Sequence, residues 1–414
     1  MKNNEPLTAE IISIGDEMTS GARVDTNGAW LSKRLGDLGI VVRYHSTVGD
    51  SLRDNIRVFG DAASRVDIVI STGGLGPTED DLTRQAVADV SRKTLVLHEE
   101  SLRHIESLFS RRKRDMPDSN RRQAMIPEGG RDIFNPMGTA PGVDVEIPRR
   151  GGRMPARIFA LPGVPAEMKQ MFDETVAPRL RNELGAGRTH VLNHVVKCFG
   201  LGESEMEQRL GGMIHRDRSP RVGITASSAT ISLRITAIGE DRDALGEQIT
   251  STVAEIRDRV GEFVFGEGDD YELQDAVIDA LEKESQSVCV LELGHDSLVD
   301  AWLSQRERPE VFAGGMTLPD ISAMHKIQSQ TGRSLTQTLK EWTNSDWVLI
   351  VSQYPALRDQ QEATAAVETT FTVIDPDGHP HLQTKALGGH PSIVRPRIAK
   401  AALAFLLACI RSSS

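Results

Sequence analysis

Short apolar runs alternate with longer amphipathic stretches along roughly the first 180 residues. Residues 11–14 and 67–71 are continuous apolar runs typical of buried strands, and residues 40–45 alternate as a strand does. Helical spacing of apolar positions appears at residues 27–38, 52–64 and 80–90. Strands and helices that alternate in this way predict βαβ units, a mostly parallel sheet and helices on both of its faces.

The pattern changes after about residue 180. Residues 194–199 and 229–238 are predicted strands, and residues 203–214 and 243–260 are predicted helices. Apolar strands alternate with helices again in the last part, at residues 287–291, 347–352 and 370–374, with a final helix over 396–410. The sequence therefore predicts three domains: an α/β three-layer sandwich over residues 1–180, a small α+β module over 181–268 and a C-terminal α/β domain over 269–414.

Composition and charge narrow the class of protein. Of the 414 residues, 39% are hydrophobic and 26% are charged, which is ordinary for a globular protein and excludes a disordered chain or a fibre. The formal net charge is -11 and aromatic residues make up 4%. Both values argue against direct binding to nucleic acid, because phosphate contacts rely on Lys and Arg and base stacking relies on aromatic rings.

The cysteines and the first residues of the chain indicate the cellular compartment in which we expect the protein. Cys198, Cys289 and Cys409 stand far apart without a CxxC spacing, which favours free thiols in a reducing environment. The N-terminus lacks the basic-then-apolar order of a signal peptide, and no apolar run approaches the ~20 residues of a membrane span. We therefore expect a cytoplasmic protein without a membrane partner.

The candidate chemistry begins with residues 72–83, which read TGGLGPTEDDLT. The three glycines permit positive φ angles and close approach of a ligand to the backbone, and the predicted helix offers its N-terminal amides to an anion. Thr78 and Asp81 would also suit a helix cap, which is the purely structural alternative. Carboxylates beside an anion site repel a phosphate unless a cation lies between them, and Mg²⁺ bridges carboxylates and phosphates. The segment thus suggests a metal-assisted nucleotide or pyrophosphate site.

A second candidate follows the first predicted strand, at residues 15–21, which read GDEMTSG. Asp16 and Glu17 stand at the carboxyl end of that strand, where α/β sheets bind their ligands. They are candidate metal ligands or bases, with ordinary turn residues as the alternative. Asn27 closes the tripeptide Asp-Thr-Asn, which either caps the following helix or contacts a ligand.

Loops punctuated by Gly and Pro supply the third group of candidates. They read NRRQA at residues 120–124, NPMGTAPG at 135–142 and LPGVPAEM at 161–168. Loops on a rigid scaffold commonly carry binding residues, although Pro-Gly also suits an ordinary turn.

These stretches, together with IGDE at 14–17, DTN at 25–27 and TVGD at 47–50, resemble the competence/damage-inducible protein CinA family in order and spacing. The first part is also similar to the molybdopterin-binding domain of the MogA and MoaB proteins, which carry Gly-Gly-Thr-Gly where this chain has GGLG at 73–76. The middle part resembles the CinA family through FGLGES at 199–204 and GEFVFG at 261–266. The resemblance covers about residues 8–270.

The resemblance implies hydrolysis of the pyrophosphate of ADP-ribose to AMP and ribose 5-phosphate with a divalent metal, of which Mg²⁺ is the one expected. Carried over to this chain, it implies that Asp80 and Asp81 bind the metal and activate water, with Glu17 as a further metal ligand. Which carboxylate acts as the base stays open. The residues expected to contact a phosphorylated, nucleotide-like ligand are Gly73, Gly74, Gly76, Thr78, Asp16, Asn27, Asn120, Gly138, Thr139, Pro162 and Gly163.

The last part departs from the family. Complete members carry a C-terminal domain that deamidates nicotinamide mononucleotide, with the signature Glu-Ser-Cys-Thr-Gly-Gly and a later Gly-Pro-Gly-Gly loop. Residues 291–298 read LELGHDSL, so Leu293 stands where the family has Ser, and the later loop at 352–356 reads SQYPA. Leucine is neither a nucleophile nor a hydrogen-bond donor, so we expect a degenerate domain without amidase activity. His295 and Ser297 are close in sequence, which is weak evidence for a Ser–His pair.

Three functions therefore stay open. The first is a metal-dependent nucleotide pyrophosphatase, the second a pterin-nucleotidyl transferase or binder, and the third a non-enzymatic interaction protein of competence or damage responses. A homodimer is expected from the resemblance and because two-fold assemblies are common.

Overall fold

The structure, a computed structural model, describes residues 6–149, 151, 153–187, 189–294, 298–331, 334–352, 354 and 364–413. It divides into two compact units, one of Met1–Leu192 with Ala237–Gly246 and one of Asn193–Thr236 with Glu247–Ser414. His295 and Ser297, the pair considered from the sequence, lie outside the described residues.

The first unit is built on a six-stranded sheet with the order β2-β1-β3-β8-β7-β6. The neighbouring strands from β2 to β8 are parallel to one another. Near the other edge, β7 is antiparallel to both of its neighbours, β8 and β6. The main strands are β1 (Thr8–Ile14), β2 (Val41–Val48), β3 (Ile68–Thr72), β6 (Arg131–Ile133), β7 (Gly142–Ile147) and β8 (Ala156–Leu161). The helices are α1 (Asp16–Thr19), α2 (Thr26–Asp37), α3 (Leu52–Arg65), α4 (Thr83–Ser91), α5 (Glu99–Arg111), α6 (Pro165–Met171) and α7 (Ala177–Leu184). A small ribbon pairs β4 (Leu95–Leu97) with β5 (Met125–Pro127), and the 3₁₀ helix η1 spans Asp118–Ala124.

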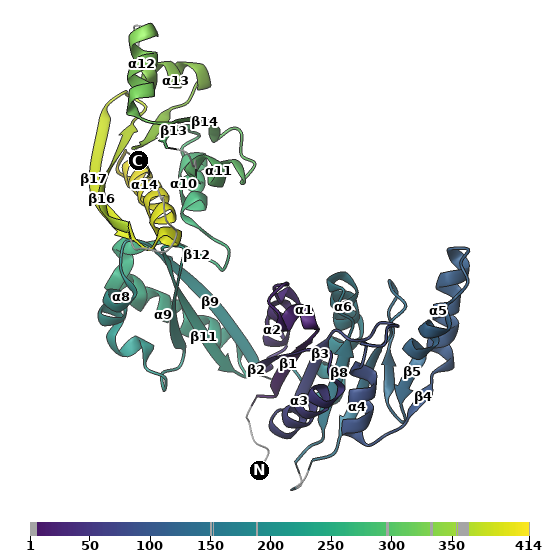
Figure 1. The fold of residues 1–414 in the computed structure, drawn as a ribbon. Helices are drawn as coiled ribbons and strands as arrows, with labels where there is room; N and C mark the ends of the chain where they lie inside the picture. Colours follow the sequence, from purple (N-terminus) through teal and green to yellow (C-terminus); the bar gives the residue numbers. More distant parts are fainter. Residues whose placement is uncertain are drawn as a thin grey trace. The chain divides into compact units, whose positions relative to one another are not determined.

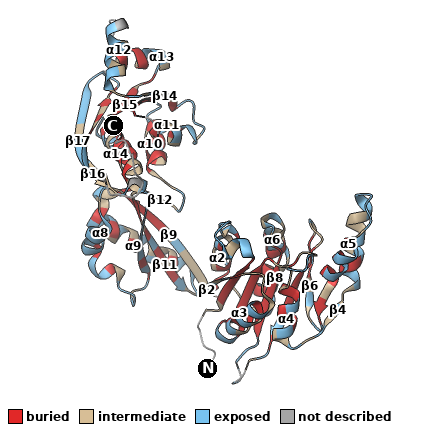
Figure 2. Ribbon diagram, in the orientation of Figure 1, coloured by how far each residue is buried: buried red, intermediate tan, exposed pale blue. Residues whose placement is uncertain are grey.

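Helices cover both faces of this sheet, which gives three layers (Figure 1). Successive strand residues point to opposite faces, so Ile11 packs in the core under α2, α6 and α7, while Ile12 packs under α3 and α4. The same alternation at Ile70 and Val69 explains why the central strands read as continuous apolar runs and are buried throughout (Figure 2). The predicted three-layer α/β fold is confirmed.

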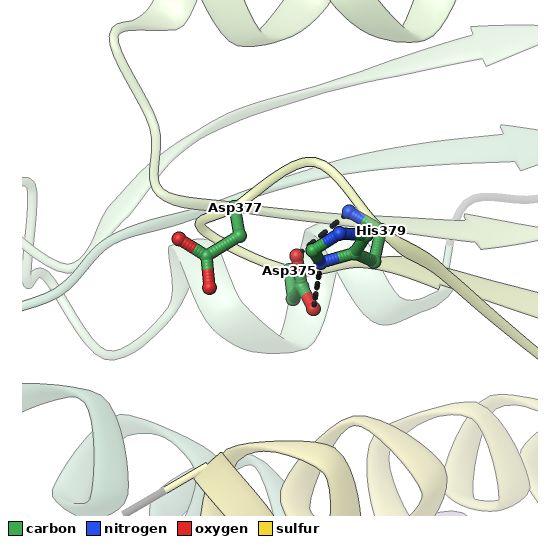
Figure 3. Close-up of side chains that lie close together, drawn as sticks. All are labelled: Asp375, Asp377 and His379. Carbon is green, nitrogen blue, oxygen red and sulfur yellow. Dashed lines mark hydrogen bonds and ion pairs between the residues drawn. The ribbon is translucent and has the colours of Figure 1, made fainter.

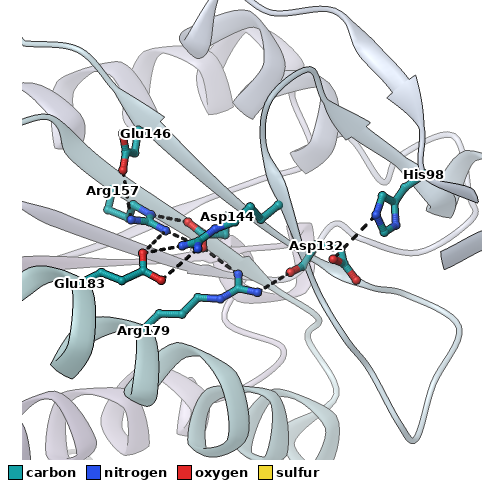
Figure 4. A network of polar contacts seen from close by, with 8 residues as sticks. His98, Asp132, Asp144, Glu146, Arg157, Arg179 and Glu183 are labelled. Atoms are coloured by element: carbon teal, nitrogen blue, oxygen red, sulfur yellow. Dashed lines mark hydrogen bonds and ion pairs between the residues drawn. The ribbon is translucent and has the colours of Figure 1, made fainter. Parts of the chain in front are cut away.

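A buried carboxylate stabilises the antiparallel edge of the sheet. Asp144 on β7 is fully buried and accepts hydrogen bonds from Arg157, Arg131 and Arg179 (Figure 4). Hydrogen bonds from three guanidinium groups compensate for the hydration that this carboxylate gives up on burial. A buried charge is tolerated only when it is paired in this way.

The second unit holds most of an α+β module, whose β9, β11 and α9 each have one end in the first unit, and the C-terminal domain. The module has a four-stranded sheet, β10-β11-β9-β12, and the C-terminal domain a five-stranded sheet, β14-β13-β15-β16-β17. The module comprises β9 (His190–Cys198), α8 (Glu203–Leu210), β10 (Arg221–Ser227), β11 (Thr230–Gly239), α9 (Arg242–Val260) and β12 (Val264–Glu267). The C-terminal elements are α10 (Leu273–Lys283), β13 (Val288–Leu293), α11 (Leu298–Ser304), β14 (Phe312–Leu318), α12 (Ile321–Thr331), α13 (Leu335–Thr343), β15 (Trp347–Val351), β16 (Thr364–Ile374), β17 (Pro380–Gly389) and α14 (Pro391–Ser413).

The elements predicted from the sequence are present with shifted ends. The largest shift that affects the site is at α4, which begins at Thr83 rather than at residue 80. Thr78 and Asp81 therefore lie in a loop, and the helix-cap alternative for them is wrong. Among the described residues, no helix combines the length and apolar character needed to cross a membrane.

Candidate functional site

A cavity of about 600 Å³ lies at the carboxyl ends of the parallel strands in the first unit. Its walls come from the turns that follow these strands: Gly15 follows β1, Asp50 follows β2, Gly73 follows β3 and Gly163 follows β8. Parallel strands bring their carboxyl ends to one edge of the sheet, so segments distant in sequence meet here.

The loop after β3 is shaped by glycines that no larger residue could replace. Gly73 and Gly74 have φ angles of +107° and +65°. A Cβ on Gly73 would lie 2.2 Å from the carbonyl oxygen of Ile14, and one on Gly74 would lie 2.2 Å from Thr83 Oγ1. The bare backbone of this loop thus packs on the end of β1 and also lines the cavity.

Asp81 and Arg84 hold the loop from two sides. Asp81 Oδ1 accepts a hydrogen bond from the Gly76 amide at 2.7 Å, and Oδ2 accepts one from the Thr78 amide at 2.9 Å and one from Thr78 Oγ1 at 2.5 Å. The Arg84 guanidinium donates to the carbonyl oxygens of Leu75 and Gly76. Its side chain is almost fully buried, and this burial lowers the pKa of Arg84 to about 10.

Asn27 ties the strand ends together. It is 9% exposed, and its Nδ2 donates to Thr72 Oγ1 at 3.0 Å and to the Gly163 carbonyl at 2.9 Å. Asp25 caps α2 by accepting from the Gly28 amide and also accepts from Ser13 Oγ. The helix-cap interpretation of the Asp-Thr-Asn tripeptide is confirmed for Asp25. Contact with a ligand stays a prediction, and both Asp25 and Asn27 line the cavity.

Negative charge dominates the cavity wall. Arg23 is the one basic side chain among the described residues that line it. Six carboxylates line it, from Glu17, Asp25, Asp50, Asp80, Asp81 and Glu167. Four of them accept hydrogen bonds from internal donors: Glu167 from Asn135, Asp50 from the Asp16 amide, and Asp25 and Asp81 as described above. The carboxylates of Glu17, Asp50 and Asp80 come from α1, the turn after β2 and the glycine loop.

Asp50 was not among the candidates from the sequence. Its carboxylate accepts from the Asp16 amide at 2.9 Å, and its amide donates to Asp16 Oδ1 at 3.0 Å. Burial raises the pKa of Asp50, and the nearby charges of Asp16, Glu17 and Asp80 raise it further. The signal available beforehand was its place directly after the second parallel strand, beside the turn of Asp16 and Glu17.

The side chain of Asp80 is exposed, and its pKa lies below the ordinary value, with the Thr78 side chain as the main cause. Asp80 is therefore ionised at neutral pH. It combines solvent access, negative charge and a place on the cavity wall.

Most candidates from the sequence line the cavity, and four do not. Those that line it are Glu17, Asn27, Gly73, Gly74, Gly76, Asp80, Asp81, Thr139, Pro162 and Gly163. The other four bond to neighbouring residues: Asp16 to Asp50, Thr78 to Asp81, the side-chain amide of Asn120 to Gln123, and the backbone amide of Gly138 to Asn135.

The C-terminal domain contains a buried carboxylate at the position of the family's signature Glu. Glu292 is 0% exposed and accepts from the amides of Val299 and Asp300 and from the Tyr354 hydroxyl at 2.6 Å. Burial raises the pKa of Glu292. Tyr354 stands in the stretch where the family resemblance would place a glycine-rich loop.

Comparisons with known proteins agree with the layout of the chain. Residues 10–182 match the model described as a probable molybdopterin binding domain, and residues 193–266 match that of the damage-inducible protein CinA KH domain. A CinA-like protein of Dictyoglomus thermophilum is 38% identical over 297 residues, covering 72% of this chain and 70% of that protein. A relative from Caldicellulosiruptor bescii, named as competence-damage inducible, is 38% identical over 361 residues, covering 84% of this chain and 85% of its own length.

A solved structure of the protein CinA from Thermoplasma acidophilum, described as of unknown function, is 33% identical. It covers 42% of this chain and 98% of its own, with a TM-score of 0.38. The relatives from Dictyoglomus and Caldicellulosiruptor are similar over most of their own length, and both matched domains occur in order. The chain belongs to the CinA family, and its first part is a domain of the molybdopterin-binding type.

Proposed function

We propose that the first unit hydrolyses the pyrophosphate bond of ADP-ribose, or of a related nucleotide, with the help of a divalent metal. The observation that carries this proposal is the cavity wall, where six carboxylates and one arginine surround a glycine loop with positive φ angles. A cavity wall this acidic repels an anionic ligand unless a cation bound between the wall and the ligand neutralises part of the negative charge.

The side chains present fit Mg²⁺. All of the candidate donors are carboxylate oxygens, the ligands that this ion prefers. The pKa of Asp50 is raised first by burial and then by repulsion from Asp16, Glu17 and Asp80, and a bound cation would relieve that repulsion. We propose Glu17, Asp50 and Asp80 as its ligands, with Asp81 holding the glycine loop next to Asp80. Among the described residues the oxygens of these three carboxylates do not all lie within 4.8 Å of one another, so binding of the ion would draw them together. Bound there, the ion would neutralise charge on the phosphate oxygens and lower the pKa of a coordinated water.

The chain's own groups would position the reactants. The bare backbone at Gly73, Gly74 and Gly76 lets a diphosphate approach closely, as no Cβ stands in its way. Asp81 is committed to three hydrogen bonds that hold the loop, so Asp80 is the better candidate to accept a proton from the attacking water. Oxygen from water joins one phosphorus, the P–O–P bond breaks, and AMP and ribose 5-phosphate leave.

The test compares two aspartates of the same region. Purified protein, Asp80→Asn and Asp89→Asn are incubated with ADP-ribose and Mg²⁺, and AMP is quantified. Asp89 lies on α4 outside the cavity lining, so Asp89→Asn should match the wild type. We expect Asp80→Asn to lower kcat by at least about 100-fold. Failure of the wild type to release AMP with Mg²⁺ or Mn²⁺ would reject the proposal.

A second candidate function is binding or nucleotidyl transfer of a pterin. The match of residues 10–182 to a probable molybdopterin binding domain favours it. Binding of molybdopterin by calorimetry, with and without ATP, distinguishes it from the first. A protein that binds neither ligand would instead support a role in protein interaction.

For the C-terminal domain we propose that nicotinamide mononucleotide deamidation is lost. Leu293 supplies no nucleophile, and the Glu292 carboxylate is already engaged by three donors. We further propose that the chain is a homodimer, which sedimentation equilibrium would test.

A further inference from the structure

A second cluster of metal-binding side chains lies in the other unit, in the turn between β16 and β17. Asp375, Asp377 and His379 each offer one ligand atom, and these atoms all lie within 4.8 Å of one another. Figure 3 shows the three side chains in this turn, with His379 beside Asp375. The cluster lies in the C-terminal domain and shares no residue with the cavity of the first unit.

His381 lies beside this set and contacts Asp375. Its Nε2 lies 3.0 Å from Asp375 Oδ2, and His379 Nδ1 lies 3.5 Å from the same oxygen. Ligands about 2.0 Å from a tetrahedral ion stand about 3.3 Å apart, so each of these two nitrogens is near the required spacing from Asp375 Oδ2. Binding of an ion would draw His381 closer to Asp377 and His379, because only Asp375, Asp377 and His379 have ligand atoms that all lie within 4.8 Å of one another.

Further hydrogen bonds hold the turn. Asp375 Oδ1 accepts from the His379 amide at 2.8 Å, while Oδ2 is hydrogen-bonded to His381 Nε2, a bond that a metal ion would replace. The Gly378 amide donates to the Asp375 carbonyl at 3.0 Å. Lys340 Nζ, from α13, donates to the carbonyl oxygens of Asp375 and Pro376. Asp375 is only 8% exposed, whereas the side chains of Asp377 and His379 are exposed to solvent. An ion from solution could therefore reach the cluster.

The turn between β16 and β17 brings these residues together. They stand at positions 375, 377, 379 and 381. The first three lie in the turn itself, and His381 is the second residue of β17, where it contacts Asp375. Two imidazole nitrogens with two carboxylates suit Zn²⁺ and related first-row ions, whereas Mg²⁺ prefers oxygen ligands alone.

We propose that the β16–β17 turn binds a divalent transition-metal ion of the Zn²⁺ class through Asp375, Asp377, His379 and His381. A turn stabilised only by its own Asp–His hydrogen bonds is the competing account, and it predicts no metal affinity at this place.

The experiment uses the full chain, stripped of metal with a chelator and titrated with Zn²⁺ against a chromophoric competitor. The double variant His379→Ala/His381→Ala should lose one equivalent of Zn²⁺, or bind it more than about 100-fold more weakly. His390→Ala, an exposed histidine outside the cluster, should keep that equivalent, and so should Asp80→Asn in the first unit.

Co²⁺ provides a second readout. Wild type should show d–d absorption bands that the double variant lacks, and excess Mg²⁺ should not abolish them. Equal Zn²⁺ stoichiometry and affinity in the wild type and the double variant would overturn the proposal, as would the absence of any one-to-one binding by the wild type. Far-UV circular dichroism confirms that each variant is folded.

Discussion

Asp81 Oδ1 accepts a hydrogen bond of 2.7 Å from the backbone amide of Gly76, five residues earlier in the glycine loop. Asp81→Asn replaces one accepting oxygen with an NH₂ group that faces a donor. We expect the free energy of unfolding to fall by about 1–3 kcal/mol in urea denaturation, together with loss of ADP-ribose hydrolysis. Asp80→Asn is the matched control for stability, because Asp80 is exposed. This variant should lose activity while its free energy of unfolding changes by no more than about 0.5 kcal/mol. Equal stability of the two variants would show that Asp81 does not hold the loop.

The glycines of the loop should tolerate no side chain. Gly73→Ala places a Cβ 2.2 Å from the Ile14 carbonyl oxygen at a φ of +107°. We expect a loss of at least about 2 kcal/mol in the free energy of unfolding. Gly60→Ala, in α3 with no atom within 4 Å of the added Cβ, should instead stabilise by about 0.5–1 kcal/mol. Thermal unfolding of both variants measures the contrast, and a neutral Gly73→Ala would contradict the packing described.

Asp50 should make stability depend on pH. Its pKa is raised in the folded chain, so its ionisation costs stability above that pKa, and the cost is absent below the ordinary aspartate value of about 3.9. Asp50→Asn keeps an oxygen that can accept from the Asp16 amide. It should be more stable than the wild type at pH 7, and the difference should vanish near pH 3. Urea denaturation at the two pH values tests the sign; a variant less stable at pH 7 would contradict it.

A bound divalent metal should offset the loss of stability that the ionised Asp50 causes. Mg²⁺ at ten times its Kd should raise the free energy of unfolding of the wild type by about 1.4 kcal/mol. Asp50→Asn should respond less, since one proposed ligand has lost its charge. Differential scanning fluorimetry with and without Mg²⁺ checks this, with Asp89→Asn as the control that should respond like the wild type. An identical response from all three proteins would exclude Asp50 as a ligand.

Tyr354 should stabilise the C-terminal domain through Glu292. Tyr354→Phe removes the hydroxyl that donates to Glu292 Oε1 at 2.6 Å and leaves the two backbone donors in place. We expect a loss of about 1–3 kcal/mol in denaturation, with no deamidation of nicotinamide mononucleotide in either protein. Deamidation by the wild type would show that the site remains active.

Apolar periodicity in the sequence placed the glycine loop and the turn of Asp16 and Glu17 at the carboxyl ends of strands, and the resemblance to the family supplied most of the other residues that line the cavity. Sequence reasoning did not name Asp50 as a site residue, although TVGD at 47–50 is one of the stretches that resemble the family, because a single Asp in a short turn does not by itself indicate a site. It also extended α4 to residue 80, because acidic residues after a Thr look like a first helical turn. The carboxylate of Asp81 instead accepts hydrogen bonds from the loop amides of Gly76 and Thr78, and the helix begins only at Thr83.

The sequence by itself determined the family, the alternation of strands and helices and the positions of the candidate loops, since these follow from local periodicity and short motifs. Tertiary structure decided which carboxylates share one cavity, that Asp81 fixes the loop, and that Asp375 and His381 meet in a turn. The reason is physical: hydrogen-bond partners and mutual repulsion depend on distances between segments that only the packing of the sheets sets.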